Sequence, residues 1–342
     1  MMHTMWRYLT AAGLSAMLGT TLGAHAGESS YRVMDKRVLA GPVRWDYLSV
    51  DSERHHLFLT RGDHVDVYDV RKREVVGSIP ATPGVHGVAV AADLGLGFSS
   101  NGAANTVTVF HLDTLAPLAT VAVGAGPDSL VYDAATHRVF VANGKANSVS
   151  VVDAVTRKIA GTIALPGAPE TAVVDGKGRL FVALEDRNAI AEIDTRKLKL
   201  VAEHRVAPAC DEPAGLAIDP QAGLLYAGCH NQKLAIVDAR SGKVVGAVPI
   251  GRGNDAVAVD LQRKLVFASN GDGTLTVVDA AAPFAVRGTV DTMPRARTVT
   301  LDPATHDLYL VSAEADTTAA PSSNGRAALK PGTFTVITVG AE

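Results

Sequence analysis

A unit of roughly 42 residues recurs along this chain, and the repeat constrains the fold more than any other feature of the sequence. Its clearest marker is a short apolar run that ends at Asp51, Ala91, Asp133, Asp175, Asp219, Asp260 and Asp302. Consecutive members of this series are 40, 42, 42, 44, 41 and 42 residues apart. A fixed period of this length is the signature of repeat architectures, in which each repeat is one supersecondary unit.

The third unit, residues 127–167, shows what one repeat contains. Four short runs rich in Val, Ile, Phe or Tyr alternate with turn residues, and such runs predict β-strands. The predicted strands are Ser129–Tyr132, Arg138–Ala142, Ser148–Val152 and Lys158–Leu165. Since seven such units follow one another, the sequence predicts an all-β fold, a seven-bladed β-propeller of four-stranded antiparallel blades.

The last unit stops one strand short. Its third-strand marker, Thr338, is followed only by the residues up to Glu342. Near the other end of the chain, Tyr31–Leu39 resembles the fourth strands at Lys158–Leu165 and Lys243–Ile250. We therefore expect this N-terminal strand to pair with the third strand of the last blade and close the ring, which removes exposed sheet edges.

Residues 1–26 have the features of a secretory signal peptide. Arg7 supplies the positive charge, Leu9–Leu22 is an uncharged apolar stretch, and Ala24-His25-Ala26 is a small-x-small cleavage site. We expect a signal peptide at 1–26 and a propeller at 27–342, with an insertion at 313–331 in the last blade. The protein is then periplasmic or secreted and has no transmembrane segment after cleavage.

Several functions are disfavoured by composition and by missing motifs. A net charge of −3 and a pI near 6.4 argue against a general nucleic-acid surface. The chain contains no nucleophile elbow, P-loop, zinc-binding HExxH helix or haem-attachment motif. The sequence predicts no cofactor, and its partner is an unknown protein or small-molecule ligand.

The second strands and their turns carry a family resemblance. They read VFVANG at Val139–Gly144, LVFASNG at Leu265–Gly271 and LGFSSNG at Leu96–Gly102. With VAVD-type first strands, these motifs resemble the YVTN-repeat propellers of bacteria and archaea over essentially the whole mature chain. The resemblance implies an exported seven-bladed propeller and says little about activity, because the motif residues form strands and turns.

One repeat position, five residues before the end of each first strand, is rich in charge. We call its members the mouth ring, because the chain enters the central channel there. They are Asp46, His86, Asp128, Glu170, Ala214, Asp255 and Arg297. Solvated polar loops are one interpretation of this ring. The other is a ligand site formed by Asp46, His86, Asp128, Glu170, Asp255 and Arg297, since clustered charge in a concavity suits a small polar ligand or a cation.

The two cysteines, Cys210 and Cys229, fall on loops of the same face. In an oxidising compartment a disulfide between them is the leading interpretation. The alternative is a soft-metal site in which the Cys229 thiolate and His230 join His86. The insertion at 313–331 lies over this face near Arg297, as a surface loop or as a lid.

Three functions follow from these residues. The first and favoured one is a non-catalytic exported binding protein that presents the mouth ring to a ligand or partner. The second is a lactonase- or lyase-like propeller enzyme, in which His86 or Glu170 acts as general acid or base and Arg297 holds an anionic substrate. The third is a periplasmic metal-binding protein with His86, Cys229, His230 and Asp128 as candidate ligands.

Overall fold

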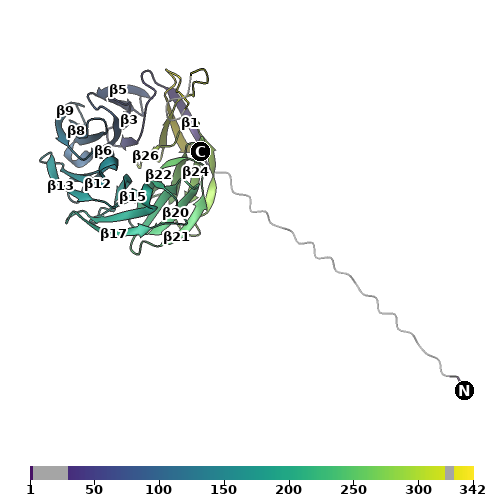
Figure 1. Cartoon of the computed structure of the whole chain (residues 1–342). Coiled ribbons are helices and arrows are strands. Elements are labelled where there is room, and N and C mark those ends of the chain that lie inside the picture. The colour runs from purple at the N-terminus through teal and green to yellow at the C-terminus, as the bar shows by residue number, and fades with distance from the viewer. Residues whose placement is uncertain (3–29, 320–326) are drawn as a thin grey trace.

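Seven four-stranded antiparallel sheets, one for each repeat unit, surround a central channel in this computed structural model (Figure 1). The structure describes residues 1–2, 30–319 and 327–342. The predicted signal peptide lies outside the described residues apart from Met1 and Met2. Within the described part of the chain, no helix is long and apolar enough to cross a bilayer. The seven-bladed β-propeller predicted from the repeat is confirmed.

The strands are grouped by their place in a blade, from the channel to the rim. The first strands are β2 (Leu48–Asp51), β6 (Val85–Ala91), β10 (Pro127–Asp133), β14 (Pro169–Val174), β18 (Pro213–Asp219), β22 (Asn254–Asp260) and β26 (Val299–Leu301). The second strands are β3 (His56–Thr60), β7 (Leu96–Asn101), β11 (Arg138–Asn143), β15 (Arg179–Leu184), β19 (Leu224–Cys229), β23 (Leu265–Asn270) and β27 (Leu308–Ser312).

The outer half of each blade follows the same plan. The third strands are β4 (Val65–Asp69), β8 (Thr106–His111), β12 (Ser148–Asp153), β16 (Ala189–Asp194), β20 (Lys233–Asp238), β24 (Thr274–Asp279) and β28 (Thr335–Ala341). The fourth strands are β5 (Glu74–Ile79), β9 (Pro117–Ala122), β13 (Lys158–Ala164), β17 (Lys199–Arg205), β21 (Val244–Pro249), β25 (Val286–Asp291) and β1 (Tyr31–Val38). Short 3₁₀ turns are η1 (Ala92–Leu94), η2 (Gly144–Ala146) and η3 (Glu185–Arg187).

The burial of each strand explains its composition. A second strand such as β11 is buried almost from end to end, because both its faces lie against neighbouring blades. A fourth strand such as β13 is mostly exposed at the rim (Figure 1). The core therefore lies between successive blades: Phe140 of the third blade is in one apolar cluster with Val182 and Leu184 of the fourth.

The ring closes as predicted. Strand β1 pairs antiparallel with β28, from Tyr31 opposite Ala341 to Val38 opposite Thr335. The first strands contact one another all the way round, including β2 of the first blade with β26 of the last. The fully buried Arg61 reinforces this junction, since it donates to the Ala40 carbonyl at 2.8 Å and lies 3.7 Å from the ring centre of Phe334.

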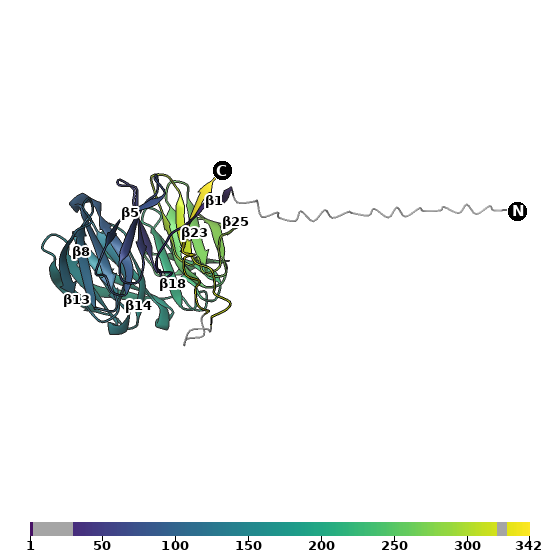
Figure 2. The same cartoon turned by 90° about the horizontal axis from the view of Figure 1, so that it is seen from above.

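The first strands have two different ends. At the far face, away from the mouth ring, six of them end in or just before a buried aspartate whose carboxylate accepts hydrogen bonds from the following turn, and we call these the turn aspartates. They are Asp51, Asp133, Asp175, Asp219, Asp260 and Asp302. At the opposite end lies the mouth ring, and the described parts of the insertion between β27 and β28 project on one side of the disc (Figure 2).

Candidate ligand site at the channel mouth

A cavity of about 870 Å³ opens at the end of the channel where the first strands begin. Five members of the mouth ring line it: Asp46, His86, Glu170, Asp255 and Arg297. The sixth ionisable member, Asp128, contacts His86. The structure thus brings together all six residues that the repeat position predicted, whereas Ala214 is buried and adds no charge.

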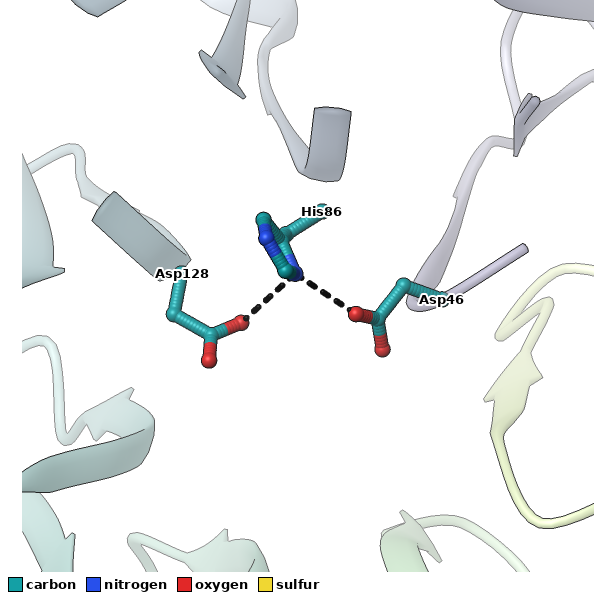
Figure 3. Close-up of side chains that lie close together, drawn as sticks. All are labelled: Asp46, His86 and Asp128. Carbon is teal, nitrogen blue, oxygen red and sulfur yellow. Dashed lines mark hydrogen bonds and ion pairs between the residues drawn. The ribbon is translucent and has the colours of Figure 1, made fainter. Parts of the chain in front are cut away.

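Asp46, His86 and Asp128 form the tightest cluster (Figure 3). His86 Nδ1 lies 2.7 Å from Asp46 Oδ2 and 3.4 Å from Asp128 Oδ1. The three residues come from successive blades, which the equal repeat spacing places side by side. The hydrogen bond that His86 donates to Asp46 raises the pKa of His86; burial opposes this, and the charge of Asp128 adds to it. The imidazole is therefore held between two carboxylates.

A second pair occupies the opposite part of the ring. Arg297 Nε lies 3.1 Å from Asp255 Oδ2. Burial raises the pKa of Asp255, and the Arg297 charge offsets part of that effect. Arg297 is thus already engaged with a carboxylate and is not a free anion-binding group.

Two further carboxyls are held partly in the neutral form. Burial, followed by the charges of neighbouring carboxylates, raises the pKa of Glu170 to about 8. The same causes, in the same order, raise the pKa of Asp128 to about 7. Like-charged groups in a poorly solvated site disfavour each other's ionisation. Near neutral pH these side chains can therefore donate as well as accept protons.

Tyr47 reaches across the channel, and it is not among the site residues predicted from the sequence. Its hydroxyl donates to Glu170 Oε1 at 3.1 Å and lies 3.3 Å from Thr171 Oγ1, so a side chain of the first blade contacts the fourth. Burial raises its pKa well above the usual value, and the charge of Glu170 adds to this. The repeat contains a signal that could have identified this residue, because Tyr47 is the one large residue at its repeat position. Its counterparts are Gly87, Ser129, Thr171, Gly215, Ala256 and Thr298.

Three arginines outside the mouth ring also line the cavity. Arg44 and Arg252 line it with exposed side chains, and neither makes an ion pair with any described residue. Arg295 Nη1 donates to the Ala327 carbonyl at 3.1 Å, which ties the end of the insertion to the cavity. Ala327 itself also lines the cavity. The insertion is therefore part of the wall, and the prediction that it could act as a lid stays untested.

Cys210 and Cys229 are joined in a disulfide with a Cα–Cα distance of 5.3 Å, as predicted. The alternative with a Cys229 thiolate as metal ligand is wrong, because that sulfur is bonded to Cys210. The bridge fixes the neighbouring His230 beside Glu212, with 2.8 Å between Nδ1 and Oε2, and Glu185 Oε1 lies 3.6 Å from the same nitrogen. His230 lines the cavity, but it belongs to this separate cluster and not to that of His86.

Solved propellers share this fold. A chain of hydrazine synthase from Kuenenia stuttgartiensis superposes with a TM-score of 0.70 at 15% identity, over 82% of this chain and 94% of that one. The WD40 repeats of RRP9 give a TM-score of 0.75 at 12% identity, over 90% and 98%. A chain of the mitotic checkpoint complex gives 0.73 at 13%, over all of both chains. Identities this low show the fold alone.

No family model matches the sequence. No curated protein matches it either.

Proposed function

We propose that this protein is an exported binding protein whose channel-mouth cavity holds a small polar ligand with an anionic group. The observation that carries the proposal is the pair Arg44 and Arg252, two guanidinium groups that line the cavity without a carboxylate partner among the described residues. Guanidinium groups bind carboxylates and phosphates through paired hydrogen bonds. The cavity volume is within the range of small-molecule sites.

The carboxyl side of the cavity supports the same ligand class. Fully ionised, Glu170 and Asp128 would repel an anion. Their raised pKa values keep part of this charge neutralised near pH 7. A protonated Glu170 also offers a hydrogen-bond donor to a ligand oxygen. Charge of both signs within one cavity favours a ligand that combines an anionic group with hydroxyl or amino groups.

Export is part of the proposal. The first 26 residues have the three-part order of a secretory signal, and disulfides such as Cys210–Cys229 persist in oxidising compartments. We place the protein in the periplasm or outside the cell. We also propose a relationship to the YVTN-repeat propellers, because VFVANG and LVFASNG lie on the second strands β11 and β23 and on the turns that follow them.

A thermal-shift panel tests the proposal, because a ligand that binds only the native state raises the melting temperature. The panel contains carboxylates, sugar acids, inorganic phosphate, neutral sugars and an oligonucleotide. We expect anionic small molecules to stabilise the wild type and to lose this effect in Arg252→Ala. Arg240→Ala is the matched control, since Arg240 is an exposed arginine on a far-face turn. Stabilisation by no anion, or an equal loss in both variants, would contradict the proposal.

A lactonase- or lyase-like enzyme is the second candidate, favoured by the hydrogen bond between Asp46 and His86. An aspartate that orients a histidine is the usual support of a general base, and the protonated Glu170 is suited to act as the acid. Hydrolysis or elimination of panel compounds by wild type, with loss of at least about a hundredfold in His86→Ala, is the expected result for an enzyme. Equal turnover in both proteins would eliminate this candidate.

A further inference from the structure

We propose that Asp46, His86 and Asp128 bind a divalent first-row transition-metal ion, with Zn²⁺ as the best fit. Each residue offers one ligand atom, and the three atoms all lie within 4.8 Å of one another. One imidazole nitrogen with two carboxylate oxygens is a ligand set that Zn²⁺ accepts. The ion binds with or without the organic ligand proposed above.

The distances fit a metal with a small adjustment. Zinc–nitrogen and zinc–oxygen bonds of about 2.0–2.2 Å at tetrahedral angles separate two ligand atoms by roughly 3.3 Å. His86 Nδ1 and Asp128 Oδ1 are 3.4 Å apart, which is already close to this value. The 2.7 Å contact between Nδ1 and Asp46 Oδ2 is a hydrogen bond through one proton. An ion that replaces this proton requires the Asp46 carboxylate to withdraw by roughly 0.6 Å.

An unsatisfied atom points to a ligand at this place. Asp128 Oδ1 is completely buried and accepts no hydrogen bond within the described residues. Buried carboxylate oxygens nearly always have a partner, because removing them from water without one is costly. The nearby Arg297 does not fill this role, since its guanidinium is paired with Asp255. A cation between Asp46, His86 and Asp128 would satisfy the free oxygen.

The position of the cluster leaves one side of the ion open. Asp46 and His86 both line the cavity, so an ion bound between them faces it. Three protein ligands and one open position are typical of metal sites that accept an external ligand. An anion held by Arg44 and Arg252 could then also bind the metal. The metal would thus add to the positive potential of the cavity.

The second cluster, Glu185, Glu212 and His230, offers the same ligand types and serves as an internal comparison. Its side chains are more open to solvent, with 59% exposure for Glu212 against 24% for Asp128. Its atoms can be hydrated by water, so it has less need of an ion. We therefore assign the ion to the Asp46 cluster.

Calorimetric titration of the EDTA-treated mature protein with Zn²⁺ alone tests the proposal. We expect one ion per chain, with affinity lowered at least about tenfold in Asp128→Asn, which keeps the size of the side chain. Two matched controls should stay within about twofold. One is His230→Gln in the second cluster. The other is His306→Gln, whose Nδ1 also lies 2.7 Å from an aspartate oxygen but has no second carboxylate within ion-pair distance in the described part of the chain.

Two results would overturn the proposal: no stoichiometric uptake by the wild type, or uptake that survives Asp128→Asn and is lost in His230→Gln. The melting temperature of Asp128→Asn without metal, measured in parallel, shows that the variant is folded. Because the titration contains no organic ligand, a failure here leaves the Arg252→Ala test of anion binding separate.

Discussion

The two ends of the first strands both carry acidic residues, but the carboxylates at the two ends lie in opposite environments. At the far face, Asp219 is nearly fully buried, and its Oδ1 accepts the backbone N–H groups of Gln221 and Ala222 at 2.9 Å. Burial alone would raise its pKa, but these bonds and the neighbouring Lys264 lower it. At the mouth ring, the Tyr47 hydroxyl is the one donor to the Glu170 carboxyl among the described residues, and the pKa of Glu170 is raised.

This difference distinguishes carboxylates that stabilise the fold from carboxylates that are available to bind a ligand. A turn aspartate stabilises the fold as an anion, because its donors are fixed by the backbone. Glu170 and Asp128 at the mouth ring are desolvated without equivalent donors, and such an arrangement costs stability when the group ionises. Strain of this kind is common at binding and catalytic sites.

Replacing a turn aspartate should cost the most stability. In Asp219→Ala the N–H groups of Gln221 and Ala222 lose their buried acceptor, and Lys264 loses its partner at 3.3 Å. We expect a loss of about 3 kcal/mol in the free energy of unfolding, measured by denaturant titration. Asp219→Asn keeps an acceptor oxygen and should lose less. A loss below about 1 kcal/mol in the alanine variant would contradict the structural role.

Stability should fall with rising pH because of the mouth ring. The pKa of Glu170 is raised from 4.5 to about 8 on folding, so between these values the folded state binds more protons than the unfolded chain. Its contribution is complete at low pH and is lost as pH rises through about 8. In EDTA, from pH 5 to pH 9, the wild type should lose about 4 kcal/mol more than Glu170→Gln. Parallel pH profiles for the two proteins would argue against a desolvated Glu170.

Removing the hydroxyl that crosses the channel should have a moderate effect. Tyr47→Phe deletes the hydrogen bond to Glu170 and should cost about 1 kcal/mol. Tyr226→Phe is the control, because its buried hydroxyl donates at 2.6 Å to the Ala280 carbonyl, away from the cavity. Both should lose stability, but only Tyr47→Phe should also alter the pH profile. The same profile in the two variants would show that Tyr47 does not act on Glu170.

Replacing an arginine that has no ion-pair partner among the described residues should have the smallest effect on stability. Arg252 is exposed and has no ion-pair partner among the described residues, so Arg252→Ala should leave the unfolding midpoint unchanged. Its effect should appear only in the affinity for anions. A clear loss of stability would show that Arg252 supports the fold and is not free for a ligand.

The repeat is what made most of the fold predictable. It gave the blades, the closing strand and the faces, and it therefore placed Asp46, His86 and Asp255 at one mouth. The predicted strand Ser129–Tyr132 differs from β10, Pro127–Asp133, by two residues at one end and one at the other. The disulfide followed from two cysteines placed on the same face.

The side-chain contacts within the mouth ring could not be predicted from the repeat. That His86 lies between Asp46 and Asp128, and that Arg297 takes Asp255, depends on side-chain length and rotamer, which the repeat does not specify. The contact of Tyr47 with Glu170 joins blades that are not neighbours. Its sequence signal, one aromatic residue among six small ones, becomes informative only when that repeat position is known to face the channel.

The most direct test compares two double variants by denaturant unfolding at pH 8 in EDTA. One is Asp128→Asn with Glu170→Gln at the mouth, and the other is Asp175→Asn with Asp219→Asn at the far face. If the mouth carboxyls are desolvated groups kept for a ligand, the first double variant unfolds at a higher denaturant concentration than the wild type and the second at a lower one. A mouth variant that is destabilised as much as the far-face variant would show that both sets of carboxylates are structural.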